Sequence, residues 1–201
     1  MSAPVTADMF AVPLRVVGAD VSLTSTGLSD GGRHLAVQTS ADEQLEVRLD
    51  RIVKGVVGMA IGYLGTERKA DLVVMEGSAY SKNKQTGHEE LAALRLMVRH
   101  RMHRLRIPVA IVTPTQLKMW ATGYGKATKA QMCAATAERY GVDWSQWLVR
   151  EGRYDMADAL ALAAMGYRHL GQPLPLVGGE PTGAVLLKSV NGIEINKEPL
   201  S

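Results

Sequence analysis

Short runs of branched apolar residues that end in a carboxylate constrain this chain more than any other feature. Residues 14–20, LRVVGAD, place two valines just ahead of Asp20. Branched side chains favour a buried strand, and a charge at the end of such a strand is costly unless a partner there requires it. Residues 71–76, DLVVME, repeat the arrangement and end in Glu76. We therefore expect buried strands whose ends carry functional acidic side chains.

Size and composition then limit the class of protein. The chain has 201 residues, enough for one domain with a substantial core but not for two large ones. Its 46% of apolar residues excludes a disordered protein, and no apolar run approaches the length of a membrane span. The N-terminus lacks a secretory signal, and a single cysteine, Cys133, cannot form an internal disulfide. These features predict a protein of the cytoplasm, or of the host-cell cytoplasm if it is viral, without a membrane partner.

Alternation and helical periodicity predict an α/β fold. Antiparallel strands are expected at residues 14–20, 21–28 and 33–39, as a three-strand meander. Apolar residues at three- and four-residue steps indicate an amphipathic helix over 43–64, and another buried strand is expected at 109–112. We expect the later strands to be parallel and helices to flank the mixed sheet.

The expected domain covers residues 14–172. Residues 1–13 show no clear periodicity and are expected to be a flexible leader. Residues 173–201 form a C-terminal extension, with apolar alternation on both sides of Asn191-Gly192. An Asn-Gly pair between two such runs is typical of a two-residue hairpin turn. The extension is therefore expected to carry a hairpin.

Capping motifs locate the starts of three later helices. Each motif pairs a threonine with a glutamine or glutamate three residues on, which is the spacing of a capping box. The first of these helices carries many arginines, which either flank a nucleic-acid groove or form an ordinary charged outer face. The three pairs are Thr86 with Glu89, Thr113 with Gln116, and Thr128 with Gln131.

Four carboxylates that are remote in the sequence are predicted to meet. Asp20 and Glu76 end strands that are expected to be parallel neighbours, so both lie at the same edge of the sheet. Asp155 and Asp158 lie near the start of an Ala/Leu-rich helix over 154–165 and share one of its faces. Close carboxylates repel by roughly 1 to 4 kcal/mol per pair, so we expect a cation among them. Two divalent ions that prefer oxygen ligands suit this set.

With these motifs, the sequence resembles the RuvC-type Holliday-junction resolvases, which have a ribonuclease-H-like fold, from about residue 15 to 169. The most specific match is the acidic helix motif at 155–161, DMADALA. Lys118 and Lys129, which lie on either side of a glycine pair, also match the family pattern. The remaining matching segments are Gly18-Ala19-Asp20, Thr26-Gly27, Met75-Glu76 and Lys82-Asn83.

The resemblance implies an activity, cofactors and partners. The activity would be that of a crossover junction endodeoxyribonuclease of DNA recombination and repair, which hydrolyses phosphodiesters symmetrically. It would use two Mg²⁺ ions per active site, for which Mn²⁺ substitutes, and no organic cofactor. The partners would be a four-way DNA junction and a second copy of the chain in a homodimer. The implied catalytic metal ligands are Asp20, Glu76, Asp155 and Asp158, with Lys118 and Lys129 as basic residues near the scissile DNA.

Lysines near the predicted carboxylate edge are candidates for holding the DNA backbone. They lie on predicted loops or helix starts, where lysines are also common as solvated surface residues. The aromatic residue that the family has shortly after the glutamate is replaced here by Ala79, with Tyr80 beside it. The full DNA-binding set is Tyr80, Lys82, Asn83, Lys84, Lys118, Lys126 and Lys129.

Other functions fit parts of the pattern. A strand followed by Gly-x-Asp and Thr-x-Thr-Gly also suits the phosphate loop of an actin-type ATPase, but that fold needs two large lobes and a second loop. A non-catalytic nucleic-acid-binding module is disfavoured, because carboxylates without a cation repel phosphates. A related ribonuclease-H-like nuclease that acts on other branched DNA or on RNA is the close alternative.

Overall fold

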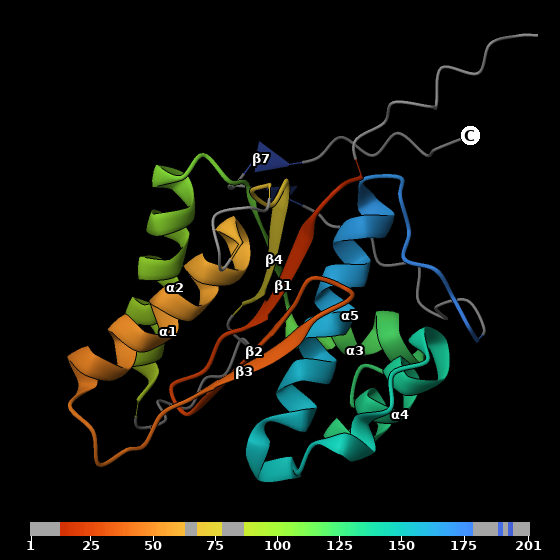
Figure 1. The fold of residues 1–201 in the computed structure, drawn as a ribbon, viewed down its shortest axis with the longest axis horizontal. Helices are drawn as coiled ribbons and strands as arrows, with labels where there is room; N and C mark the ends of the chain where they lie inside the picture. The colour runs from red at the N-terminus through yellow and green to blue at the C-terminus, as the bar shows by residue number, and fades with distance from the viewer. Residues whose placement is uncertain (1–12, 63–67, 78–86, 179–188, 191–192, 195–201) are drawn as a thin grey trace, which may run out of the picture.

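The computed structural model describes residues 13–62, 68–77, 87–178, 189–190 and 193–194. Within them, helices lie on both faces of a mixed seven-stranded sheet with the order β3-β2-β1-β4-β5-β6-β7 (Figure 1). The strands are β1 Val16–Asp20, β2 Ser25–Ser29, β3 His34–Gln38, β4 Leu72–Glu76, β5 Val109–Val112, β6 Ser189–Val190 and β7 Ile193–Glu194. The helices are α1 Leu45–Ile61, α2 His88–Arg104, α3 Pro114–Thr122, α4 Lys129–Tyr140 and α5 Arg153–His169, with short 3₁₀ helices η1 Trp144–Gln146 and η2 Val149–Glu151.

The strand pairing confirms the mixed sheet that the sequence predicts. β1, β2 and β3 form an antiparallel meander, while β1, β4 and β5 are parallel. In the register between β1 and β4, Ala19 lies opposite Met75. Asp20 and Glu76, the next residues along, therefore leave the sheet at the same edge.

The prediction of a strand over 21–28 is wrong at its start. Its first four residues form a turn held by Ser22, whose Oγ accepts hydrogen bonds from the backbone N–H groups of Thr24 (3.3 Å) and Ser25 (3.2 Å). Thr26 closes the turn, because its Oγ donates to the Ser22 carbonyl oxygen at 2.8 Å. Short polar side chains compete with the sheet for backbone groups, and here they delay the start of β2 to Ser25.

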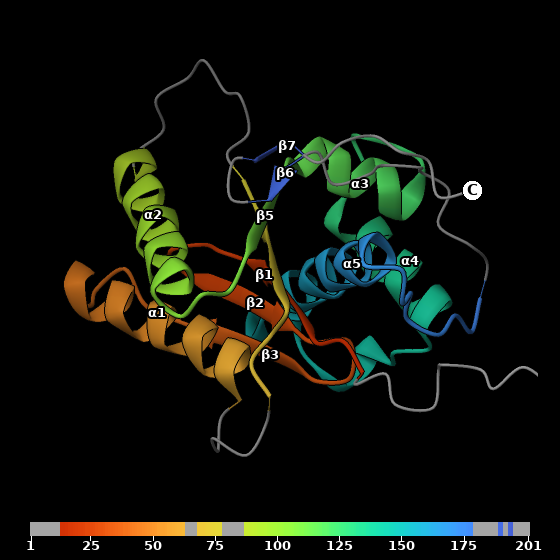
Figure 2. The same ribbon diagram turned by 90° about the horizontal axis from the view of Figure 1, so that it is seen from above.

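Two helical layers cover the sheet (Figure 2). α1 and α2 pack on one face, where Ile52 of α1 and Leu94 of α2 join Val17 of β1 in a buried cluster. α3, α4 and α5 lie on the other face. Every residue of α5 from Met156 to Gly166 is buried. The Ala/Leu-rich helix is thus the central element of its layer.

Two glycines let α5 lie directly on the strands. A Cβ atom on Gly18 of β1 would lie 1.9 Å from the carbonyl oxygen of Ala159, and one on Gly27 of β2 would lie 2.0 Å from that of Asp155. Both distances are far below van der Waals contact, so a larger residue at either position would push the helix away. Gly27 is also the register partner of Asp20. The close approach therefore sets the first turns of α5 beside the end of β1.

Two of the three predicted capping boxes are confirmed. Thr113 and Thr128 each accept a hydrogen bond from the backbone N–H three residues on, at the starts of α3 and α4. Thr86, the first residue of the third predicted box, lies outside the described residues. α2 has Gly87 as its N-cap, with φ 84° and no side-chain hydrogen bond. A glycine in the left-handed region starts this helix by turning the chain rather than by accepting a bond.

Two short strands lie in the expected C-terminal extension. β6 pairs antiparallel with β7, and β6 also pairs antiparallel with β5, so the extension lengthens the sheet. The turn at 191–192 and most of the expected leader, residues 1–12, lie outside the described residues. None of the described helices is long and apolar enough to cross a bilayer.

Candidate active site

The four predicted carboxylates come from three elements that meet at one edge of the sheet. Asp20 is the last residue of β1, and Glu76 is the last residue of the parallel strand β4. Asp155 and Asp158 lie in the first turns of α5, which packs on β1 and β2 through the two glycines. We call this set of four residues the carboxylate cluster.

The surroundings of Asp20 and Asp158 disfavour the ionised form of both carboxyls. Burial, followed by the charges of Glu76 and Asp158, raises the pKa of Asp20 well above its usual value. Burial, followed by the charge of Glu76, raises the pKa of Asp158 to about 7. Burial alone raises the pKa of a carboxyl, and like charges within interaction range raise it further. The charges of these carboxylates therefore act on one another.

Glu76 has both acidic and basic neighbours. Burial raises its pKa, although the positive charges of Arg95 and Lys118 oppose the shift. Arg95 comes from α2 and Lys118 from α3, so basic side chains approach Glu76 from helices on opposite faces of the sheet. The protein thus places positive charge beside the carboxylate cluster.

Asp155 is held through both of its carboxylate oxygens. The Lys129 ammonium donates to Oδ1 at 2.7 Å, and the Ser25 hydroxyl donates to Oδ2 at 2.5 Å. Burial by itself would lower the pKa of Lys129, but the hydrogen bond and the charge of Asp155 outweigh it and raise that pKa. Lys129 is therefore an ammonium ion bound to the carboxylate cluster.

The chemistry of the cluster fits a hard divalent cation. Asp158 is only 7% exposed, and its Oδ1 has no hydrogen-bond partner. A buried carboxylate oxygen without a partner is costly, and a cation would satisfy it. Carboxylates are the ligands that Mg²⁺ and Mn²⁺ favour. Across residues 13–62, 68–77 and 87–178, however, no three His, Cys, Asp or Glu side chains are grouped so that they could hold a metal ion, so the carboxylates are not preformed around one point.

The predicted DNA-contacting residues fall into two groups. Lys118 is half-buried on α3 near Glu76, and Lys129 is exposed at the start of α4. Lys126 is exposed on the connection between α3 and α4. The other members, Tyr80, Lys82, Asn83 and Lys84, lie outside the described residues.

Two features of the site are not evident from the sequence. Arg95 is one of many arginines in its helix, and only its place beside the buried Leu94 marks it as lying at the border of the buried face. The contact between Ser25 and Asp155 depends on the distance between a strand and a helix. That distance cannot be inferred from any local sequence pattern.

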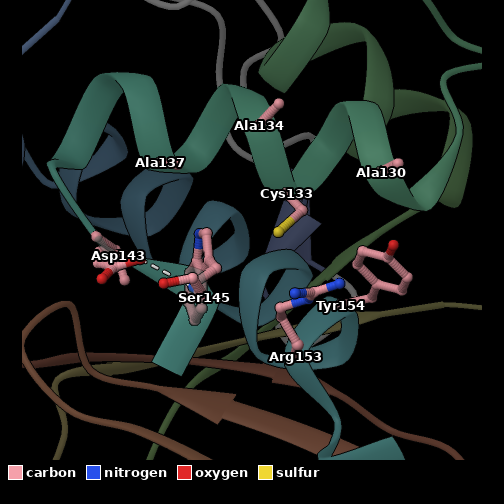
Figure 3. Close-up of a pocket in the computed structure, with 10 residues that line it drawn as sticks. Ala130, Cys133, Ala134, Ala137, Asp143, Ser145, Arg153 and Tyr154 are labelled. Carbon is pink, nitrogen blue, oxygen red and sulfur yellow. Dashed lines mark hydrogen bonds between the residues drawn. The ribbon is translucent and has the colours of Figure 1, made fainter. Parts of the chain in front are cut away.

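A shallow depression adjoins the start of α5 (Figure 3). Its volume is about 360 Å³, and Cys133 and Trp144 are among its lining residues. Arg153 and Tyr154 also line it, and the guanidinium carbon of Arg153 lies 5.2 Å from the centre of the Tyr154 ring. No member of the carboxylate cluster lines this depression, so the two sites are distinct.

Comparison with known proteins identifies relatives over most of the chain. No protein-family model matches it. The crossover junction endodeoxyribonuclease RuvC of Streptomyces avermitilis is 32% identical over 162 residues, which cover 75% of this chain and 85% of that protein. RuvC of Thermobifida fusca is 33% identical over 75% of this chain and 82% of that protein. RuvC of Syntrophomonas wolfei is 31% identical over 75% of this chain and 86% of that protein.

Solved structures have the same fold. Thermus thermophilus RuvC matches with a TM-score of 0.58 and 22% identity, over 81% of this chain and 100% of that one. T. thermophilus RuvC in complex with a Holliday junction substrate matches with a TM-score of 0.61 and 20% identity, over 82% of this chain. These matches confirm the ribonuclease-H-like fold. The sequence relatives, of which this chain covers 82–86%, show that it belongs to the RuvC family of crossover junction endodeoxyribonucleases.

Proposed function

We propose that this chain is a divalent-metal-dependent endonuclease that resolves four-way (Holliday) DNA junctions. The observation that carries the proposal is the carboxylate cluster, in which the buried Oδ1 of Asp158 has no partner. The names of the relatives support the activity, and the neighbour solved with a Holliday junction substrate supports the substrate. Because the chain belongs to the RuvC family, the hypothesis that it is an actin-type ATPase is dropped. The relatives come from bacteria, in which DNA lies in the cytoplasm, so the proposal includes a cytoplasmic location, or the host-cell cytoplasm if the protein is viral.

The carboxylate cluster would hold two Mg²⁺ ions, for which Mn²⁺ substitutes. Such ions, when bound, activate the attacking water and neutralise charge on the scissile phosphate. The chain supplies ligands in fixed places, because strand ends carry Asp20 and Glu76 while the first turns of α5 carry Asp155 and Asp158. Burial of these carboxylates strengthens their attraction for a cation. Hydrolysis requires no organic cofactor.

Lys118 and Lys129 would stabilise the charge that develops on the phosphate. Lys118 acts on Glu76 through its charge, and Lys129 donates to Asp155, so both ammonium groups lie near the proposed reaction centre. A fixed positive charge beside a reacting phosphate favours the transition state. The other proposed contacts with DNA are Tyr80, Lys82, Asn83, Lys84 and Lys126.

A two-fold dimer suits a four-way junction, because resolution cuts two strands symmetrically. α2 supports this arrangement, since its Leu96 and Met97 leave 63% and 40% of their surface exposed. Neighbouring apolar side chains that are exposed mark interaction surfaces. The proposed partner for this part of α2 is a second copy of the chain.

The test of function compares Mg²⁺-dependent cleavage of a synthetic four-way junction with that of a linear duplex, a flap and an RNA–DNA hybrid of equal length. We expect paired, symmetric nicks in the junction and little cleavage of the others. Preferred cleavage of the flap or the hybrid would support the alternative, a related ribonuclease-H-like nuclease acting on other branched DNA or on RNA.

Asp20→Asn should abolish cleavage and leave junction binding largely intact in a gel-shift assay. Retained cleavage would remove Asp20 from the mechanism.

A further inference from the structure

A chain of hydrogen bonds leads from the sheet to Asp155. Gln38 Nε2 donates to Ser25 Oγ at 3.0 Å, and Ser25 Oγ donates to Asp155 Oδ2 at 2.5 Å. We propose that Ser25, oriented by Gln38, is a positioning residue that fixes the Asp155 carboxylate for cation binding. This inference rests on the proposed metal site and adds two residues to it.

The bond directions give the Ser25 hydroxyl a single target. A serine hydroxyl has one hydrogen and two lone pairs. Because the Gln38 amide donates to one lone pair, the hydroxyl hydrogen is directed to Asp155 Oδ2. Hydrogen bonds to an ionised carboxylate are short and strong, and the distance of 2.5 Å agrees with such a bond. The carboxylate is thereby held in one rotational position.

The backbone keeps this support in place. Ser25 and Gln38 are direct partners in the register between β2 and β3, so their side chains lie on the same face of the sheet. Gly152, which precedes α5, packs against that face with φ 84°. A Cβ atom there would lie 2.4 Å from Ala36 Cβ and 3.0 Å from Ser25 Oγ. Glycine at this position therefore lets α5 begin close enough for Asp155 to reach Ser25.

The two oxygens of Asp155 consequently have different roles. Oδ2 is held by Ser25, an uncharged group on a strand, whereas Oδ1 is held by Lys129, whose side chain is 58% exposed. Exchange of Lys129 for a divalent ion at Oδ1 needs no rotation of the carboxylate while Ser25 keeps Oδ2 in place. Preorganisation of this kind lowers the entropic cost of binding.

The test measures Mn²⁺ binding to the metal-free, DNA-free protein by electron paramagnetic resonance, so it needs no cleavage. Ser25→Ala removes the donor and should weaken Mn²⁺ binding by about tenfold or more, as the loss of a group that orients a metal ligand typically does. Ser25→Thr keeps the hydroxyl in a residue that favours strands, and it should restore the wild-type affinity. Gln38→Ala should cause a smaller loss, because it frees the hydroxyl without removing it. Thr24→Ala, at the exposed neighbour of Ser25, is the matched control and should change nothing.

Equal Mn²⁺ affinity in Ser25→Ala and the wild type overturns the proposal, and so does a loss that Ser25→Thr fails to restore. The melting temperature of each metal-free variant shows whether it folds. Should Ser25→Ala not fold, Gln38→Ala compared with the wild type decides the question by the same readout. Mn²⁺ binding is measured without DNA, so it tests the role of Ser25 separately from the proposed substrate. A protein that binds Mn²⁺ but cuts no junction would overturn the proposed substrate. The comparison of Ser25→Ala with the wild type would still decide the role of Ser25.

Discussion

At the scale of single residues, Lys129 connects the carboxylate cluster with the proposed DNA site. Its ammonium bonds to Asp155, yet more than half of its side chain is exposed. Burial raises the pKa of Asp20, and the charge of Lys129 opposes that rise. A lysine on a flexible four-carbon stem can change partners with little rearrangement of the backbone. Lys129 is therefore suited to pair with an acid before the substrate binds and with a phosphate afterwards.

Lys129→Ala should slow single-turnover cleavage of a junction by roughly 100-fold, the usual effect of losing a preorganised charge at a reacting group. Junction binding should weaken far less, because one phosphate contact is a small share of the total electrostatic affinity. Lys54→Ala is the matched control, since Lys54 Nζ lies 2.6 Å from Asp50 in an exposed ion pair on α1. A cleavage rate for Lys129→Ala equal to that of Lys54→Ala would contradict the catalytic role.

At the scale of elements, the position of α5 on the sheet decides whether an active site exists. The helix brings Asp155 and Asp158 to the edge that β1 and β4 define. Gly27 permits this approach, because its missing side chain leaves room for the backbone of Asp155. The geometry of the site is therefore encoded partly in residues that have no functional group.

Gly27→Ala should lower the free energy of unfolding by about 1–3 kcal/mol or more, since a methyl group there would overlap the Asp155 backbone. Mn²⁺ binding should weaken in parallel, because α5 must move away from the strand ends. Urea denaturation and Mn²⁺ titration measure the two effects. Gly32→Ala is the control, as a Cβ atom at Gly32 meets nothing within 4 Å. Similar stability losses in both variants would show that the helix–strand contact is not responsible.

Helix starts and strands whose formation depends on residues within the element itself are predictable from the sequence. The capping boxes at Thr113 and Thr128 form as expected, and so do the strands that end in Asp20 and Glu76. Prediction failed where a competing local hydrogen bond decided the outcome. The side chain of Ser22 delays the start of β2 by holding backbone N–H groups that a strand would use.

The site was predictable in its acidic residues but not in their surroundings. Asp155 and Asp158 belong to a distinctive helix motif, and a strand end explains the position of Asp20. The help that Ser25 gives to Asp155, and the charge that Arg95 brings to Glu76, arise from the packing of separate layers. Packing distances across layers depend on small residues far away in the sequence, so no pattern near Ser25 or Arg95 reveals them. The roles in metal and DNA binding stay predictions.

At the scale of the whole molecule, the proposed dimer places an apolar part of α2 against a second copy. Leu96→Glu should shift the protein from dimer to monomer in light scattering after size-exclusion chromatography, because a buried charge without a partner opposes association. Val177→Glu is the control, since Val177 is 78% exposed and lies outside α2. A Leu96→Glu protein that remains dimeric would place the interface elsewhere.

The stability of the whole molecule should depend on pH through the carboxylate cluster. Burial, followed by the charge of Glu76, raises the pKa of Asp158 from an ordinary 3.8 to about 7. Between these values, the folded protein holds a proton that the unfolded chain has released. The contribution of Asp158 to the free energy of unfolding is therefore fully present below pH 3.8 and is lost as the pH rises to about 7. A shift of this size corresponds to at most on the order of 4 kcal/mol.

Thermal unfolding with EDTA should accordingly show that Asp158→Asn gains stability relative to the wild type as the pH rises from 4 to 8, because the amide cannot ionise. Saturating Mg²⁺ at pH 8 should reduce this difference, since a bound cation stabilises the ionised carboxylates of the wild type. Asp143→Asn is the control, because hydrogen bonds from Ser145 lower the pKa of Asp143. The folded and unfolded forms of Asp143 are then both ionised above pH 4, so the stability difference between this variant and the wild type should not change between pH 4 and 8. A stability difference between Asp158→Asn and the wild type that does not change with pH in EDTA would mean that Asp158 does not titrate in this range. Burial and the repulsion within the carboxylate cluster would then raise the pKa of Asp158 less than the structure indicates.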